Sequence, residues 1–434
     1  MSRIRPSRRP YESLGWVLVR TPALPADAYL ALADGTSAAA VRWQTEDGTW
    51  VPADPWVRLA LTVGGGNLLP ALRKNAQKNR AVRAKLLRYQ IRMSTRPTPY
   101  GLFAGVALGT IGRATDIAIA GAPPVLRARP DMGWLLSFVG ALEARPELRR
   151  QLRMTAHPAA LSLAGRVFLT DATPLSDGTG LGTVSVRESG AVRAVLAHAC
   201  APIPYSQLAD ALRHLPGADA DRVEQLLTEL WQQGLLLTDL RPPLTTGSPA
   251  AYVARRLSSL AGPPPEARQL QAALDALGDW GRLGPAEAAA AWPALEAALD
   301  ALHPAAGTPI QVDLGLPVAT ATVSARVADE AARAAELLLR LTLLPRGLPH
   351  LAAYRAAFAA RYGHDREVPL LELLDPHFGL GPPSSYGQGG AAGFDGRRMA
   401  MRQETLQAIA LAAAAERRLA VELDEAMLTR LAVW

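Results

Sequence analysis

Residues 92–109, RMSTRPTPYGLFAGVALG, constrain the fold more than any other stretch of this 434-residue chain. Pro97 and Pro99 fix their own φ angles and push the residues before them into extended conformations. The small apolar residues that follow favour a buried strand over residues 102–111. The stretch that precedes them, residues 68–94, contains no glycine and favours a long helix. The sequence therefore predicts a helix that runs into a stiff turn and then into the core.

The predicted helix is strongly basic. Eleven basic residues and no acidic ones lie between Asp54 and Asp116. Like charges on one helix face repel each other, and a bound polyanion would relieve that repulsion. A solvated helix face is the alternative, but the long acid-free stretch and the net charge of +7 favour nucleic acid or phosphate as a partner. Helical spacing places five of these residues on a single stripe: Lys74, Lys78, Lys85, Arg88 and Arg92.

Two polar residues fall on the stiff turn itself, Arg96 and Thr98. A rigidly held arginine binds a phosphate or carboxylate bidentately and loses little conformational entropy on binding. The other interpretation is an ordinary connection between a helix and a strand that happens to carry arginines. Composition alone leaves both interpretations open.

The rest of the chain mixes strand-like and helix-like patterns, which predicts an α+β fold. Residues 16–25 alternate as a strand with Trp16, Leu18 and Arg20 on one face. Asp131 suits the N-cap of a helix that starts one residue later.

Residues 157–243 have the order of a small winged-helix module: a hairpin, three short helices and a strand-like exit. We therefore divide the chain into three parts. Residues 1–156 hold the basic helix, residues 157–243 form the inserted module, and residues 244–434 continue the first part with a helical connector followed by strands and helices.

The pattern RxxxRxTPYGLFAG resembles the signature of the lantibiotic dehydratase family, in its N-terminal, tRNA-dependent glutamylation domain. Further blocks resemble the same domain in the same order: VLVRTPALP, RPDMGWL, GRVFLT with TVSVRESG, IQVDL, and RYGHDREVPLLELLDPHFGLGPPSSYG. The resemblance covers most of the chain. It implies a glutamylation-domain core with an inserted winged-helix module that recognises a leader peptide.

Enzymes of this family transfer glutamate from glutamyl-tRNA to Ser or Thr hydroxyls of a ribosomally made precursor peptide, and a separate elimination domain then leaves a dehydroamino acid. By resemblance, this chain is expected to be an aminoacyl-tRNA-dependent transferase of natural-product biosynthesis. Two alternatives stay open: a non-catalytic fragment or subunit of a split dehydratase that binds leader peptide and tRNA, and a ligase that appends an amino acid without elimination.

The candidate site residues have three roles: the resemblance supplies the catalytic ones, and the basic stripe supplies the tRNA-binding ones. The catalytic positions that the resemblance carries over are Arg20, Arg92, Arg96, Thr98, Asp131 and Asp313, although each aspartate also suits a helix cap or a strand end. The tRNA-binding positions are Lys74, Lys78, Lys85 and Arg88. The leader-binding candidates are Val184, Val186, Leu226, Leu227 and Leu230, although the leucines suit the core of the module equally well.

Several motifs that would indicate other chemistry are absent from the sequence. The sequence has no phosphate-binding G-x-x-x-x-G-K-[ST] loop and no paired metal spacing among its histidines, so we expect no metal and no cofactor beyond glutamyl-tRNA as co-substrate. The one cysteine, Cys200, excludes internal disulfides, suits a reducing cytoplasm and is expected in the core. We expect neither a signal peptide nor a membrane span.

The expected partners are a precursor peptide, through both its leader and its core, charged tRNA such as tRNA-Glu, and a separate elimination domain or subunit. DNA is not expected, because the third helix of the module carries more acidic than basic residues. A homodimer is compatible with the sequence. By resemblance, the chain is expected to stop inside the glutamylation domain.

Overall fold

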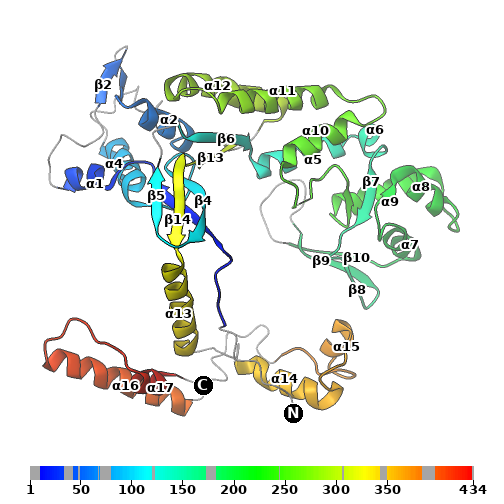
Figure 1. The fold of residues 1–434 in the computed structure, drawn as a ribbon. Helices are drawn as coiled ribbons and strands as arrows, with labels where there is room; N and C mark the ends of the chain where they lie inside the picture. The colour runs from blue at the N-terminus through cyan, green and yellow to red at the C-terminus, as the bar shows by residue number, and fades with distance from the viewer. Residues whose placement is uncertain are drawn as a thin grey trace. The chain divides into compact units, whose positions relative to one another are not determined.

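The computed structural model describes residues 10–33, 43–46, 49–66, 68, 80–119, 123–172, 182–243, 245–304, 307–342, 349–383 and 396–432. Helices and strands are mixed along the chain, which confirms the α+β prediction (Figure 1). The chain divides into two compact units. Unit 1 comprises residues 1–17, 108–117 and 320–434, and unit 2 comprises residues 18–107 and 118–319.

A six-stranded sheet is built around β4, the strand that the sequence predicted after the stiff turn. β13 and β14 follow one another along the chain, and both pair in parallel with β4, through Gly315↔Val106 and Thr322↔Thr110. The strand order is β5-β14-β4-β13-β6, and β1 also pairs with β4. The strands are β1 (Trp16–Pro22), β4 (Ala104–Gly112), β5 (Asp116–Ile119), β6 (Val125–Pro130), β13 (Ile310–Gly315) and β14 (Val318–Ser324).

The opening strand has the alternation that its sequence predicts. Trp16, Leu18 and Arg20 are exposed, whereas the residues between them are partly buried. The backbone after β1 is tied to the predicted turn, because Leu24 N–H donates to the Met93 carbonyl and Ala23 N–H to the Phe103 carbonyl, at 2.8 and 3.0 Å.

Most helices of unit 2 share one hydrophobic cluster. Its centre includes Phe103, Phe138 and Trp280, none more than 2% exposed. The part of the predicted long helix that the structure describes is α4; residues 69–79 lie outside the described residues. The elements are α1 (Ala26–Ala33), α2 (Pro55–Gly64), α4 (Arg80–Thr95), α5 (Met132–Glu143), α6 (Pro146–Arg149), α10 (Pro249–Ser258), α11 (Pro265–Trp280) and α12 (Pro285–Leu302), with a hairpin of β2 (Trp43–Glu46) and β3 (Thr49–Pro52).

A second hydrophobic cluster lies within residues 153–238, and from here on the module means these residues instead of the predicted range 157–243. Its sheets have the orders β10-β9-β8 and β11-β7-β12, and the three predicted helices are present. The prediction for Cys200 is wrong: its side chain is exposed, just beyond the buried Ala199 that ends the helix. The elements are β7 (Arg153–Ala156), β8 (Leu161–Leu163), β9 (Arg166–Ala172), β10 (Gly182–Arg187), α7 (Gly190–His198), β11 (Ile203–Pro204), α8 (Tyr205–Arg213), α9 (Ala220–Gln232) and β12 (Leu236–Thr238).

Unit 1 ends in a series of helices: α13 (Ala325–Leu341), α14 (Pro349–Tyr362), α15 (Leu370–Leu374), α16 (Gly396–Ala415) and α17 (Glu425–Leu431). Arg340 of α13 forms an ion pair with Glu425 of α17, with 2.7 Å between Nη2 and Oε2. None of the helices that the structure describes is both long enough and apolar enough to cross a membrane.

Candidate functional site

The end of α4 and the turn after it are held firmly in the core. Met93 and Phe103, on either side of the turn, have no exposed surface. Gly101 has a φ of +52°, a left-handed conformation that residues with a Cβ atom rarely adopt, so a glycine is needed there. The Tyr100 ring packs on Phe103 with 5.6 Å between centroids. These contacts fix the turn that carries Arg96 and Thr98.

Arg92 lies in the last turn of α4 and packs on the same aromatic group. Its guanidinium carbon is 4.8 Å from the centroid of the Tyr100 ring, which is a cation–π contact. Its Nε atom is buried and has no hydrogen-bond partner among the described residues. The guanidinium is therefore pre-positioned by the ring, while part of its hydrogen-bonding capacity is unused.

A hollow of about 610 Å³ runs along this face of α4. Four cations line it and no acidic residue does so within the described part of the chain. The described residues that line it are Lys85, Arg88, Tyr89, Ile91, Arg92, Thr95 and Arg96. Lys85 Nζ lies 5.8 Å from the centroid of the Tyr89 ring. A concave surface whose charged residues are all positive concentrates anions such as phosphates.

The structure thus brings together four of the residues singled out in the sequence: Lys85, Arg88, Arg92 and Arg96. Lys74 and Lys78 lie outside the described residues. Arg20 on β1 and Thr98 on the turn are exposed, and neither is among the residues that line the hollow in the described part of the chain.

Asp131 and Asp313 both make structural contacts. The Asp131 carboxylate caps α5 by accepting hydrogen bonds from Gly133 N–H and Trp134 N–H, at 2.8 and 3.3 Å. Its own N–H donates to the Pro309 carbonyl, next to the start of β13. The N-cap prediction is confirmed.

Asp313 lies on β13 and forms an ion pair with Arg129 of β6. Its backbone partner across the strands is Arg127, so two arginines of one strand face lie beside this carboxylate. Sequence reasoning did not single out Arg127 and Arg129. The alternation VLRARP, with basic residues at every second position, was the available signal.

The leader-binding candidates separate into two groups. Leu227 and Leu230 are 0% and 3% exposed and belong to the hydrophobic core of the module, the alternative that the sequence had left open. Val184, Val186 and Leu226 are only partly buried. Both valines lie on β10, which pairs only with β9 among the described strands and so leaves its other edge open.

A buried polar cluster ties the module to α5 and was not predicted. Glu143, the last residue of α5, has no exposed surface. Its carboxylate accepts hydrogen bonds from the Thr238 hydroxyl, from Trp231 Nε1 at 3.2 Å and from Arg241 Nη2 at 3.1 Å. The signal in the sequence was a single carboxylate in a helix with no other charged residue, MGWLLSFVGALE.

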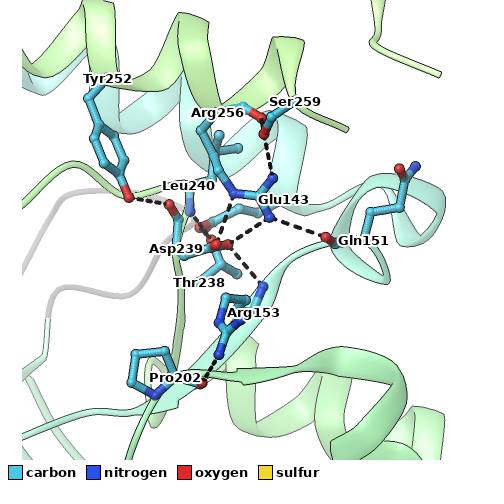
Figure 2. Close-up of polar contacts among 10 residues, drawn as sticks. All are labelled: Glu143, Gln151, Arg153, Pro202, Thr238, Asp239, Leu240, Tyr252, Arg256 and Ser259. Atoms are coloured by element: carbon cyan, nitrogen blue, oxygen red, sulfur yellow. Dashed lines mark hydrogen bonds and ion pairs between the residues drawn. The ribbon is translucent and has the colours of Figure 1, made fainter. Parts of the chain in front are cut away.

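Asp239 extends this cluster to α10 (Figure 2). Its carboxylate accepts hydrogen bonds from Arg153 N–H and from Arg256 Nε, both at 2.9 Å. Arg256 also donates to the Gln151 carbonyl at 3.2 Å, and Tyr252 Oη donates to the Asp239 carbonyl at 2.8 Å. Since the segments before β7 and after β12 meet here, the cluster fixes both ends of the module.

Glu224 of α9 forms a second polar contact between the module and α6. Burial on its own would raise the pKa of Glu224, but hydrogen bonds from Tyr205 and Arg150 and the charges of Arg150 and Arg149 bring that pKa below its ordinary value. Burial and the Glu224 carboxylate raise the pKa of the Tyr205 phenol. The carboxylate form of Glu224 is therefore part of the folded state.

A match to a known protein family shows to which class this chain belongs. Residues 53–433 match the family model described as "Lantibiotic dehydratase, N terminus". This match covers most of the chain, so the chain belongs to the lantibiotic dehydratase family, as its sequence motifs indicated.

Individual relatives place the chain more closely. Subtilin biosynthesis protein SpaB of Bacillus subtilis is 28% identical over 319 residues, which are 71% of this chain and 30% of SpaB. The crystal structure of the tRNA-dependent lantibiotic dehydratase MibB from Microbispora sp. 107891 has 30% identity and a TM-score of 0.75, and the match covers 98% of this chain and 40% of MibB. The glutamylation domain of TbtB, from thiomuracin biosynthesis, has 20% identity and a TM-score of 0.56 over 88% of this chain and 49% of that domain. The chain thus spans less than a third of SpaB and less than half of MibB.

Proposed function

We propose that this chain provides the site at which glutamate is transferred from glutamyl-tRNA to Ser or Thr hydroxyls of a precursor peptide. The observation that carries the proposal is the hollow on α4, where four cations converge with no acidic residue among the described lining residues. The acceptor end of a charged tRNA is a polyanion that presents both phosphates and an amino acid. The similarity to MibB and to the TbtB glutamylation domain supports the same assignment.

The proposed reaction is an acyl transfer. The peptide hydroxyl oxygen attacks the carbonyl carbon of the ester that joins glutamate to the terminal ribose, and the ribose oxygen leaves carrying the hydroxyl proton. Because this ester is already activated, the protein has only to align the two reactants and stabilise the oxyanion. The product ester would then pass to a separate elimination domain or subunit.

Arg92 and Arg96 would hold tRNA phosphates or the glutamate carboxylate, and Thr98 would donate a hydrogen bond beside them. Asp131 or Asp313 would bind the amino group or accept the hydroxyl proton. Because Asp131 caps α5 and Asp313 is paired with Arg129, either role requires the carboxylate to share or exchange its present partner. Arg20 is assigned to the site only by the resemblance of its motif to the family's.

The module would bind the leader segment of the same peptide. An extended leader can add as a further strand to the open edge of β10, using main-chain hydrogen bonds for affinity and the half-buried Val184 and Val186 for side-chain contacts. Val186→Asp should weaken leader binding without unfolding the chain, since Val186 is only partly buried. Leader binding that the variant leaves unchanged would remove this surface from the proposal.

A salt titration of tRNA binding tests the site. We expect the slope of log K against log[salt] to become shallower by about 0.7 to 0.9 for each phosphate contact that the Arg92→Ala/Arg96→Ala variant loses. Arg268→Ala is the matched control, because Arg268 is an exposed arginine on α11 that does not line the hollow. Equal salt slopes for the double variant and the control would refute the tRNA site.

A single-turnover transfer assay then separates catalysis from binding. The wild type with glutamyl-tRNA and precursor peptide should yield a glutamyl ester, and Arg92→Lys should lose much of this activity because lysine keeps the charge but not the planar fork. A second candidate is a non-catalytic subunit that binds tRNA and leader peptide, which the cationic hollow and the open edge of β10 support equally well. Binding of tRNA and leader with no transfer by the isolated chain would support that candidate.

A further inference from the structure

Strands β6 and β13 form an antiparallel platform within unit 2, with six residue pairs in register. One face of the platform belongs to the hydrophobic core, where Leu126, Val312 and Leu314 are buried. The C-terminal end of α11 packs tightly on β6, since a Cβ atom on Gly281 would lie 2.6 Å from the Leu126 carbonyl oxygen. Side chains on the other face therefore extend from a backbone that is fixed by the core.

That other face carries a carboxylate between two guanidiniums. Asp313 lies directly opposite Arg127, and residues in this position have Cβ atoms about 4.5–5.5 Å apart. Asp313 forms its ion pair with the next arginine of the same strand face, Arg129, through Nη1 and Oδ2. The Arg127 guanidinium has neither a hydrogen bond nor an ion pair with any residue that the structure describes. Only one of the two arginines is therefore engaged by the carboxylate.

This arrangement leaves groups of opposite charge for a ligand to bind. The ion pair uses one carboxylate oxygen of Asp313, and an ionised carboxylate can accept hydrogen bonds at both of its oxygens. Arg127 keeps a planar fork of donors, which binds another carboxylate bidentately. The complementary ligand carries an ammonium group and a carboxylate a short distance apart.

Glutamate that is esterified through its α-carboxyl group is such a ligand, because its ammonium group and its side-chain carboxylate are both free. We propose that Asp313 binds the ammonium group of the transferred amino acid and that Arg127 binds its side-chain carboxylate. Arg129 is then a positioning residue that holds Asp313, and Arg127 determines the specificity for an acidic amino acid. The cations of the hollow on α4 are left for the tRNA phosphates. This inference rests on the proposed function for the identity of the substrate.

The first test compares the transfer of glutamate and of glutamine from the same tRNA to the precursor peptide. Glutamine has the shape of glutamate without the negative charge, so the wild type should prefer glutamate in kcat/KM by about tenfold or more. Arg127→Gln should abolish this preference. Arg129→Gln should slow both transfers equally and keep the preference, because it acts through Asp313. The matched control is Arg268→Gln on α11, which should change neither rate.

A binding measurement separates this inference from the proposed transfer reaction. The probes are 3′-amino-3′-deoxyadenosine joined to glutamate or to glutamine by an amide bond, which resists transfer. Calorimetry on the full chain should show tighter binding of the glutamyl probe, and Arg127→Gln should make the two Kd values equal. Asp313→Asn should weaken both probes, since both carry the ammonium group. Discrimination through Arg127 without any transfer to peptide would refute the proposed function and leave the amino-acid site standing.

Charged residues on these strands also have a structural use, because cross-strand pairs stabilise a sheet and charges on an edge strand prevent unwanted pairing. That use alone would change Tm or aggregation and leave the preference for glutamate intact. Two results would overturn the inference: a wild type that does not prefer the glutamyl probe, or a preference that Arg127→Gln retains. A preference that Arg92→Gln removes while Arg127→Gln retains it would assign the side-chain carboxylate to the hollow.

Discussion

Replacing Glu143 with alanine should destabilise the junction between α5 and the module more than any surface substitution. The side chain has no exposed surface and accepts hydrogen bonds from a hydroxyl, an indole and a guanidinium. Alanine would leave the buried Trp231 indole N–H and Thr238 hydroxyl without an acceptor. It would also leave the Arg241 charge, whose side chain is 24% exposed, without its partner.

The magnitude follows from these contacts. Breaking a buried ion pair by removing one partner costs about 3–5 kcal/mol, because the other charge stays in a poorly solvated place. We expect a value near 3 kcal/mol, since the partial exposure of Arg241 lets water reach its guanidinium. A loss of this size is a substantial fraction of the roughly 5–15 kcal/mol that stabilises a typical domain.

Native-state hydrogen exchange on the full chain is the suitable assay, because it reports the junction separately from the rest of a multi-part protein. A loss of about 3 kcal/mol corresponds to roughly a 10²-fold faster exchange for the amides of α9 and β12. Amides of α11 and α12, which are not part of the junction, serve as the internal control.

A double variant distinguishes charge from packing. Glu143→Leu combined with Arg241→Leu removes both charges, and apolar replacement of a buried pair is often neutral or stabilising. The double variant should therefore recover the part of the protection that the unpaired Arg241 charge costs, while the Trp231 and Thr238 donors stay without their acceptor. Exchange that is less than threefold faster in Glu143→Ala, or a double variant as weak as the single one, would refute the reasoning.

Three further predictions concern stability and access. The pKa of Glu224 is lowered in the folded state, so its contribution to stability is complete above roughly pH 4.3, the unfolded value, and is lost as the pH falls through the folded value. Glu224→Gln should therefore flatten the acid side of a plot of Tm against pH, and an unchanged acid side would count against the contact. Gly109→Ala should lower the free energy of unfolding by about 1–3 kcal/mol, and with it the Tm, because the new Cβ would lie 2.4 Å from the Ala321 carbonyl oxygen. An unchanged Tm would show that the strands can separate there. Cys200 is exposed, so a maleimide should label the native chain at the rate of a free thiol, and labelling only after unfolding would contradict the structure.

Local sequence was sufficient for features that depend on neighbours along the chain. Three predicted features appear in the structure: the turn within residues 92–109, the capping carboxylate of Asp131 and the three helices of the module. Each depends on backbone preferences and on contacts within a few residues, which a single sequence displays directly. The basic stripe was also visible, because helical spacing alone placed Lys85, Arg88 and Arg92 together.

Tertiary structure decided which of two roles a side chain has. It placed Leu227 in the core but Cys200 in solvent, although the sequence allowed a core position for both. It also joined Arg129 to Asp313 and Arg241 to Glu143, residues that are 184 and 98 positions apart. Both pairs depend on how strands and helices from distant segments pack. For Glu143, which has no exposed surface, desolvation makes the charge stable only when its partner is in place. Periodicity in the sequence shows which face of a helix or strand a residue occupies. Tertiary packing determines whether that face contacts the core, another element or solvent.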